Sequence, residues 1–287
     1  MSIDRVFVAG AGLMGHGIGQ VYAAIGRQVW LYEPDPARAG AGRERIAGNL
    51  DRGVAKGRLD AAERDVILAR VTATSEMAAA ADADLVIEAV FEDIGIKQAL
   101  WRELDAIAPP VAVFASNTSS ISIDLLASAV SPARRTRFVG MHFFSPVPVM
   151  PLVELIRGAA TTDATEAAIR DLTEALGKKL IVSADRPGFI VNRILMPLLA
   201  EAMRTLEEGT GTADDIDTGA RVGLNHPMGP LELADFIGLD VCLNVMKVLH
   251  EGIGGEHFRP PKILEDLVAA GHLGQKTGRG FHAYPRS

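Results

Sequence analysis

The 287-residue chain is poor in cysteine and contains no long apolar run. Its one cysteine, Cys242, cannot form a disulfide within the chain, and we therefore expect a protein of the reducing cytoplasm. No cysteine and histidine cluster has the spacing of a zinc site, so we predict no metal. No apolar stretch could cross a bilayer, and a strand pattern begins close to the N-terminus, so we expect neither a membrane span nor a signal peptide.

The balance of charge argues against nucleic acid as a partner. The net charge is −7 and the isoelectric point is about 5.5, so a general nucleic-acid surface is not expected. Apolar residues make up 48% and charged residues 23% of the chain, as in soluble globular proteins with a full core. The length suits one large or two ordinary domains, and there is no internal repeat or low-complexity segment.

The N-terminal part of the chain has the pattern of a strand, a glycine turn and a helix. Val6–Ala9 has the length and composition of a buried parallel strand and leads into the G-x-G-x-x-G sequence of Gly10–Gly15. A helical pattern follows and stops at Gly26. A second apolar run, Val29–Tyr32, ends on Glu33. These elements together predict a βαβ unit.

Such a unit predicts a dinucleotide site. Gly10 permits a tight turn, Gly12 lets a diphosphate approach the backbone, and Gly15 lets the helix pack against the strand. The helix N-terminus attracts the diphosphate, while Glu33 lies where an acid binds the adenosine ribose hydroxyls. A carboxylate there repels a 2′-phosphate, so we predict NAD rather than NADP. The alternative is a glycine turn that binds nothing. The expected cofactor contacts in this unit are Gly10, Gly12, Leu13, Met14, Gly15 and Glu33.

Other candidate residues follow later strands, because ligands of open α/β sheets lie beyond the carboxyl ends of the strands. At the end of the strand Leu85–Val90 and beyond it, Ala89, Glu92 and Lys97 are candidate cofactor neighbours. The alternative for Glu92 and Lys97 is a surface acid and base that open a helix. After the strand Val111–Ala115 come the small polar residues Ser116–Ser120. They could hold a nicotinamide amide or a substrate oxygen, or cap the next helix.

A histidine and a buried acid form the strongest candidate for chemistry. We expect a strand over Arg137–Met141 with His142 at its carboxyl end, and Glu154 within the apolar run Leu152–Ile156. A carboxylate inside a buried strand is costly unless it is paired, and His142 is the nearest cationic partner in sequence. The alternative is a core histidine unrelated to an edge-strand glutamate.

A charge-rich helix is predicted over Ala37–Lys56. Its face could be solvated, or it could dock an anionic substrate tail such as the phosphates of coenzyme A. The basic residues of this region are Arg38, Arg43, Arg45, Arg52, Lys56 and Arg58.

The order of elements indicates two domains. Strands and helices alternate up to about residue 183, which predicts an α/β fold with a doubly wound, mainly parallel Rossmann-type sheet in residues 1–184. Beyond Asp185–Gly188 the pattern is helical, so residues 185–287 should form an all-α domain for substrate binding and dimerisation. The glycine-rich basic segment Gly274–Phe281 could meet phosphate or form a disordered tail.

With these pieces in place, the chain resembles the 3-hydroxyacyl-CoA dehydrogenases nearly end to end. The resemblance is specific because seven motifs occur in the same order. They are GAGLMG, ASNTSS, MHFFSPVPVM, LVELI, PGFIVNR, HPMGPLEL and KTGRGF. It implies a two-domain fold, NAD, an acyl-CoA substrate, a homodimer, and oxidation of (S)-3-hydroxyacyl-CoA to 3-ketoacyl-CoA, 3-hydroxybutyryl-CoA being the expected substrate.

The resemblance also implies roles for single residues. His142 resembles the catalytic base and Glu154 the carboxylate that orients it, while Ser119 and Asn192 match residues that bind the substrate oxygen. The implied cofactor contacts are Glu33, Glu92, Lys97, Asn117, Ser119 and Lys276. Asn49 and Lys56 fall near the segment that contacts coenzyme A, in a looser alignment.

The chain departs from the pattern of the family at two positions. Ser145 stands where many relatives carry asparagine, which puts a cofactor contact in doubt more than the activity. His16 stands where alanine or serine is usual, and the sequence offers no explanation for it. Two other functions remain open: a dehydrogenase of a free hydroxy acid, of the gulonate or carnitine type, and a non-catalytic NAD-binding protein.

Overall fold

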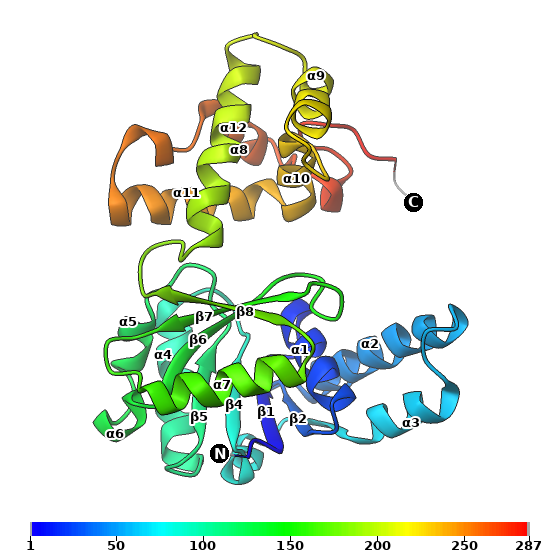
Figure 1. Ribbon diagram of the computed structural model, residues 1–287, viewed down its shortest axis with the longest axis vertical. Coiled ribbons are helices and arrows are strands. Elements are labelled where there is room, and N and C mark those ends of the chain that lie inside the picture. Colours follow the sequence, from blue (N-terminus) through cyan, green and yellow to red (C-terminus); the bar gives the residue numbers. More distant parts are fainter. Residues whose placement is uncertain (1, 286–287) are drawn as a thin grey trace. The chain divides into compact units, whose positions relative to one another are not determined.

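The computed structural model describes residues 2–285, which divide into two compact units, residues 2–186 (unit 1) and 187–285 (unit 2). Unit 1 is built on one eight-stranded sheet with helices on both faces (Figure 1). Its strands are β1 (Arg5–Ala9), β2 (Gln28–Tyr32), β3 (Val71–Thr74), β4 (Leu85–Glu88), β5 (Val113–Ser116), β6 (Phe138–Phe143), β7 (Leu152–Arg157) and β8 (Lys179–Ala184).

The strands lie in the order β3-β2-β1-β4-β5-β6-β7-β8. The first six are parallel, β7 pairs with β6 in the antiparallel sense, and β8 is parallel to β7. The predicted doubly wound, mainly parallel sheet is therefore confirmed. The strand order reverses between β1 and β4, and crevices for ligands form at such a reversal, beyond the carboxyl ends of the strands.

The helices of unit 1 connect these strands. They are α1 (Leu13–Ala24), α2 (Pro36–Ala55), α3 (Ala61–Ala69), α4 (Ile94–Ile107), α5 (Ile123–Ala127), α6 (Pro132–Arg135) and α7 (Asp163–Ala175). Helix α2 begins where Asp35 accepts a hydrogen bond from the N–H of Ala37 at 2.9 Å, and Pro36 occupies the first helical position. Burial of Val, Ile and Leu side chains from both faces of the central strands forms the core of the unit.

Unit 2 is helical, as predicted. Its helices are α8 (Val191–Glu207), α9 (Ala213–Thr218), α10 (Pro230–Ile237), α11 (Leu239–Ile253) and α12 (Lys262–Ala269). A separate core joins them, with Leu199, Met203, Leu231 and Met246 fully or almost fully buried. Helix α8 continues through Pro197.

The structure corrects several boundaries. Strand β6 extends to Phe143, so His142 lies inside it and not after its end, because the antiparallel pairing with β7 continues to that residue. A 3-10 helix over Met77–Asp82 connects β3 to β4. The glycine-rich segment is ordered and not a disordered tail, since Gly274 and Arg279 form a β-bridge and Phe281 packs on the core of unit 2.

Candidate active site

The glycine turn has the geometry of a phosphate-binding turn. Gly10 has φ +104°, and a Cβ there would lie 2.5 Å from the carbonyl oxygen of Ala89. A Cβ on Gly12 would meet nothing within 4 Å, so the backbone is open to a ligand at this point. Helix α1 starts directly after Gly12, with no side-chain cap and no acidic residue in its first turn. Its N–H groups and positive dipole are thus suited to an anion.

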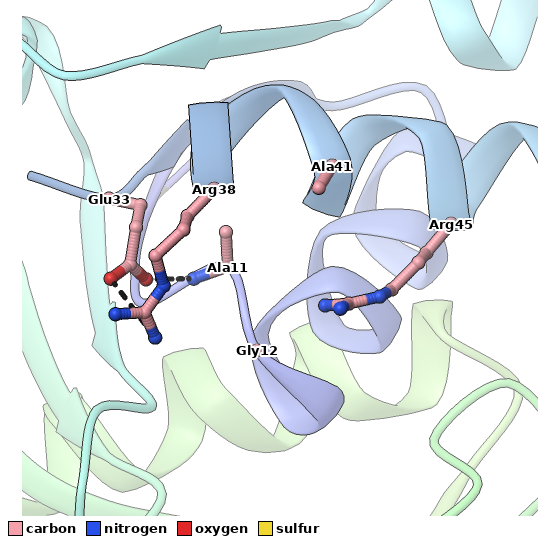
Figure 2. A pocket seen from close by; sticks show the side chains of 6 residues that line it. All are labelled: Ala11, Gly12, Glu33, Arg38, Ala41 and Arg45. Atoms are coloured by element: carbon pink, nitrogen blue, oxygen red, sulfur yellow. Dashed lines mark hydrogen bonds and ion pairs between the residues drawn. The ribbon is translucent and has the colours of Figure 1, made fainter. Parts of the chain in front are cut away.

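Glu33 lies at the carboxyl end of β2, beside this turn. The N–H of Ala11 donates a hydrogen bond to its Oε2 at 3.0 Å. A pocket opens here between the turn and α2, lined by Ala11, Gly12, Glu33, Arg38, Ala41 and Arg45 (Figure 2). One carboxylate oxygen is bonded to the turn, and the pocket is the place where the ribose end of a dinucleotide would fit.

The structure explains how the imidazole of His16 is accommodated at the start of α1. Its side chain is 9% exposed, and Nδ1 lies 2.7 Å from the carbonyl oxygen of Gly12. A carbonyl oxygen can only accept, so Nδ1 carries the proton. Burial lowers the pKa of His16, the bond to Gly12 opposes this, and the charge of Arg45 lowers the pKa further. A neutral imidazole therefore supports the carbonyl of the residue that precedes α1.

A buried ionic cluster follows β4. Lys97 is 1% exposed, and its Nζ lies 2.5 Å from Glu88 and 3.1 Å from Glu92. Glu88, fully buried at the end of β4, also accepts from Ser116 Oγ at 2.6 Å and from the N–H of Val90 at 2.9 Å. Sequence reasoning placed Lys97 beside the cofactor, and the structure directs its ammonium group to these two carboxylates.

Glu92 connects this cluster to the polar segment after β5. Its Oε1 accepts hydrogen bonds from Thr118 Oγ1 at 2.6 Å, the N–H of Ser119 at 2.9 Å and the N–H of Ser120 at 3.2 Å. Burial raises the pKa of Glu92, but Lys97 and these hydrogen bonds lower it by more, so the carboxylate is held ionised. The segment that carries Ser119 is thereby held by the negative charge of Glu92.

Asn117 joins the same segment to β6. Its Oδ1 accepts from the N–H of Phe143 at 2.9 Å, and its own N–H donates to the carbonyl of Glu88 at 2.8 Å. One residue therefore ties together the ends of β4, β5 and β6, where the candidate residues of unit 1 gather.

His142 and Glu154 face each other across the antiparallel pair β6 and β7. They are register partners, and His142 Nδ1 lies 3.1 Å from Glu154 Oε2. His142 is 7% exposed and Glu154 fully buried. A carboxylate bound to Nδ1 fixes the tautomer and the orientation of the ring. The geometry is that of a histidine oriented by a buried carboxylate.

The connection that follows His142 is held by Lys178. Its Nζ donates to the carbonyl oxygens of Val147 and Met150, both at 2.7 Å. Burial lowers the pKa of Lys178. The peptide bond between Ser145 and Pro146 is cis.

The remaining predicted residues lie elsewhere. Asn49 on α2 donates to Gln20 Oε1 at 3.0 Å, and Lys56 is exposed at the end of the same helix. Lys276 pairs with Asp240 at 2.5 Å within unit 2. Asn192 is buried in the first turn of α8, also in unit 2. The predicted roles of these four residues stay predictions.

Sequence reasoning missed Glu88 and Lys178 as parts of the site and did not assign Arg38 and Arg45 to a pocket. Glu88 interrupts the apolar run Leu85–Val90 as Glu154 interrupts its own strand, and that signal was readable. Arg38 and Arg45 are seven residues apart, which places them on one face of a helix two turns apart. Lys178 gave no such signal, because its carbonyl partners are far away in sequence.

Within residues 2–285 no group of three or more His, Cys, Asp or Glu side chains is placed to hold a metal ion. The same residues include no helix long and apolar enough to cross a membrane.

A doubly wound sheet with a glycine turn before a helix, an acid at the end of the second strand and a His–Glu pair is typical of nicotinamide-dependent dehydrogenases. Comparison with known proteins then identifies the family. Residues 5–186 match "3-hydroxyacyl-CoA dehydrogenase, NAD binding domain" and residues 188–284 match "3-hydroxyacyl-CoA dehydrogenase, C-terminal domain". The chain belongs to the 3-hydroxyacyl-CoA dehydrogenase family.

Individual relatives match over nearly their whole length. A 3-hydroxybutyryl-CoA dehydrogenase of Bradyrhizobium diazoefficiens is 49% identical over 282 residues, 98% of this chain and 96% of that protein. The human mitochondrial hydroxyacyl-coenzyme A dehydrogenase is 40% identical, covering 98% of this chain and 91% of its own. The crystal structure of (S)-3-hydroxybutyryl-CoA dehydrogenase from Ralstonia eutropha superposes with a TM-score of 0.95 at 44% identity, covering 99% of this chain and 100% of that one.

Proposed function

We propose that this protein oxidises (S)-3-hydroxybutyryl-CoA to acetoacetyl-CoA with NAD, and catalyses the reverse reaction. The observation that carries the proposal is the 3.1 Å contact between His142 Nδ1 and Glu154 Oε2, in a chain of this family. The similarity to 3-hydroxybutyryl-CoA dehydrogenases supports a short acyl chain.

The residues of unit 1 fit the cofactor. The open backbone at Gly12, the uncapped start of α1 and the carboxylate of Glu33 would hold the diphosphate and the ribose. NAD, when bound, supplies the acceptor for the hydride that leaves C3 of the substrate.

His142 then acts as the general base. Its neutral imidazole takes the proton of the C3 hydroxyl at Nε2, and returns a proton in the reverse direction. Glu154, bonded to Nδ1, holds the ring in place and stabilises the imidazolium. Ser119, whose N–H is bonded to Glu92, binds the substrate oxygen as its charge develops. Asn192 is proposed for the same task by resemblance alone.

The decisive experiment measures NADH oxidation with acetoacetyl-CoA in the wild type and in His142→Ala. We expect turnover to fall by about 10²-fold to 10⁴-fold, the usual contribution of a general base. NADH affinity, measured by fluorescence titration, should be unchanged because His142 does not bind the nucleotide in this scheme. Turnover at the wild-type rate in the variant would remove His142 from the mechanism.

The substrate class is tested separately. We expect 3-ketoacyl-CoA thioesters to react and free hydroxy acids, including gulonate and carnitine, to be inert. A series of acyl chain lengths would give the preferred substrate. Efficient oxidation of a free hydroxy acid would replace the proposal, and the absence of turnover with every thioester would favour a non-catalytic role.

We further propose that unit 2 mediates a homodimer. Two apolar side chains one helical turn apart on α8 support this, since Ile194 is 68% exposed and Leu198 is 40% exposed. Sedimentation equilibrium should give twice the mass of the chain, and Ile194→Glu should weaken the association. A monomer in the wild type would contradict the proposal.

We also propose that the protein works in the reducing cytoplasm. Its single cysteine, Cys242, is buried, and burial raises the pKa of its thiol to about 12.

A further inference from the structure

The pocket beside the glycine turn contains more positive charge than binding a ribose diol requires. Arg38 and Arg45 both extend from α2 into the pocket that Glu33 and Gly12 line (Figure 2). The two arginines are two helical turns apart on one face. Arg43, which lies between them in sequence, has a structural role instead. Its guanidinium donates to the carbonyls of Val71 and Leu68 at 2.9 and 3.3 Å.

Arg38 is directed at the carboxylate that would bind the ribose. Its Nη2 lies 3.7 Å from Glu33 Oε1, while the other carboxylate oxygen accepts from Ala11. The Arg38 side chain is 58% exposed and that of Glu33 only 15%. An exposed guanidinium is free to turn, so one that reaches Glu33 also reaches a group attached to the ribose 2′-oxygen. Guanidinium groups bind phosphate in a bidentate geometry.

Arg45 occupies the other end of the same pocket, towards the turn. In Figure 2 its guanidinium points to the start of α1. Its charge acts on His16, the side chain bonded to the carbonyl of Gly12. This position suits the diphosphate, which both nicotinamide cofactors contain.

We propose that Arg38 is the positively charged half of a 2′-phosphate site and that Glu33 alone keeps this site closed to NADP. In this inference, which rests on the proposed dehydrogenase function, Arg45 binds the diphosphate of either cofactor. The chain is thus one substitution away from using NADP(H) as the cofactor of the same reaction.

The test is Glu33→Gln, assayed with acetoacetyl-CoA and either NADH or NADPH. The amide oxygen still accepts from the N–H of Ala11, so the turn is retained, but the negative charge is gone. We expect kcat/KM for NADPH to rise about tenfold or more, because a hydrogen bond to a charged group commonly contributes that factor. We expect kcat/KM for NADH to fall, because a ribose hydroxyl loses a charged acceptor.

Arginine variants separate the two guanidinium groups. Adding Arg38→Ala to Glu33→Gln should abolish the gain with NADPH and leave the rate with NADH at the level of Glu33→Gln. Arg45→Ala should reduce kcat/KM for both cofactors by the same factor. Arg170→Ala is the matched control, since Arg170 is also half exposed and paired with a glutamate, Glu166, on the distant helix α7. It should change neither rate.

Binding measurements keep this inference distinct from the proposed function. Calorimetric titration with 5′-AMP and with adenosine 2′,5′-bisphosphate reports on the pocket without turnover. Tighter binding of the bisphosphate to Glu33→Gln, lost on adding Arg38→Ala, supports the inference even if no thioester reacts. Turnover of acetoacetyl-CoA with NADH but no gain for either 2′-phosphate ligand in Glu33→Gln would overturn the inference and leave the proposed function intact. A gain that survives the loss of Arg38 would also overturn it.

Discussion

The two units bury carboxylates in different ways. In unit 1, Glu154 and Glu88 meet side-chain bases, His142 at 3.1 Å and Lys97 at 2.5 Å. In unit 2, Asp217 and Asp235, each 1% exposed, mainly meet backbone N–H groups. Both arrangements satisfy the carboxylate, but in unit 1 each acid contacts an ionisable side chain of the sheet or of the helix that follows it, whereas in unit 2 the ionisable partners supplement backbone donors.

The acids of unit 2 organise its chain ends and turns. Asp217 accepts from the N–H groups of Leu231 and Glu232, at 2.8 and 3.0 Å, and so caps the start of α10. It also lies 2.7 Å from His282 Nε2. Asp235 accepts from the N–H groups of Phe281 and His282, both at 2.9 Å, and from Tyr284 Oη at 3.1 Å.

Buried acids with a structural role differ from those with a catalytic role in the partners that they contact. An acid saturated by backbone N–H groups holds a segment in place, and its removal should cost stability. An acid paired with one titratable side chain near a ligand-binding edge can change the protonation of that side chain, and its removal should cost activity. The Lys97 cluster lies between these cases, since it is buried and charged but also determines the conformation of the segment that carries Ser119.

The largest effect should come from Glu154→Gln. The amide keeps the volume but cannot stabilise an imidazolium, so we expect kcat to fall by about 10²-fold to 10⁴-fold. Stability, measured by urea unfolding, should change far less than activity does. An unchanged kcat with an unchanged pH profile would show that Glu154 is a structural acid like Asp235.

Lys97→Met should cause the largest loss of stability. It leaves the fully buried Glu88 without its cation and removes the charge that Glu92 also contacts, and breaking a buried ion pair typically costs about 3–5 kcal/mol. Lys97→Arg keeps the charge if Lys97→Met does not fold, and should lose less. The matched control is Lys262→Met, since Lys262 pairs with Asp266 on an exposed surface, where water screens the pair and its loss should change stability little. Equal losses of stability in Lys97→Met and Lys262→Met would contradict a stabilising role of the Lys97 cluster.

Asp235→Asn should weaken unit 2 without affecting the chemistry. An amide has one acceptor oxygen in place of two, so at least one of the three donors loses its partner, at about 1–3 kcal/mol. The affinity of unit 1 for NADH should not change. Proteolysis should cleave the variant faster near residue 281, and a resistance equal to that of the wild type would indicate that Asp235 does not hold this segment.

The smallest effect concerns pH. The pKa of Glu92 lies below its ordinary value of 4.5, so its ionisation stabilises the fold at pH above 4.5, and this contribution is lost as the pH falls through the lowered pKa. Unfolding of the wild type and of Glu92→Gln should therefore differ most at neutral pH and converge in acid. A difference that is constant from pH 7 to pH 3 would show that charge is not the cause.

Much of the site could be predicted because its signals are local. The glycine turn and Glu33 lie within one βαβ unit, and their spacing follows from the geometry of that unit. The sequence could not show that the Ser119 segment is held by Glu92, because three hydrogen bonds to that acid come from residues 26–28 positions away. Nor could it divide the arginines of α2 into structural and pocket residues, since helical spacing places Arg38 and Arg45 together without showing what they face.

By itself, the sequence determined the class of fold, the nucleotide turn, the acid at the end of β2 and the presence of an acid inside an apolar strand, because periodicity and glycine spacing act over a few residues. Only the tertiary structure decided which base each buried acid meets. The antiparallel register of β6 and β7 sets His142 opposite Glu154, and the strand order sets Glu88 beside Ser116. Such pairings depend on how strands from distant parts of the chain align, and burial then makes each pairing energetically necessary.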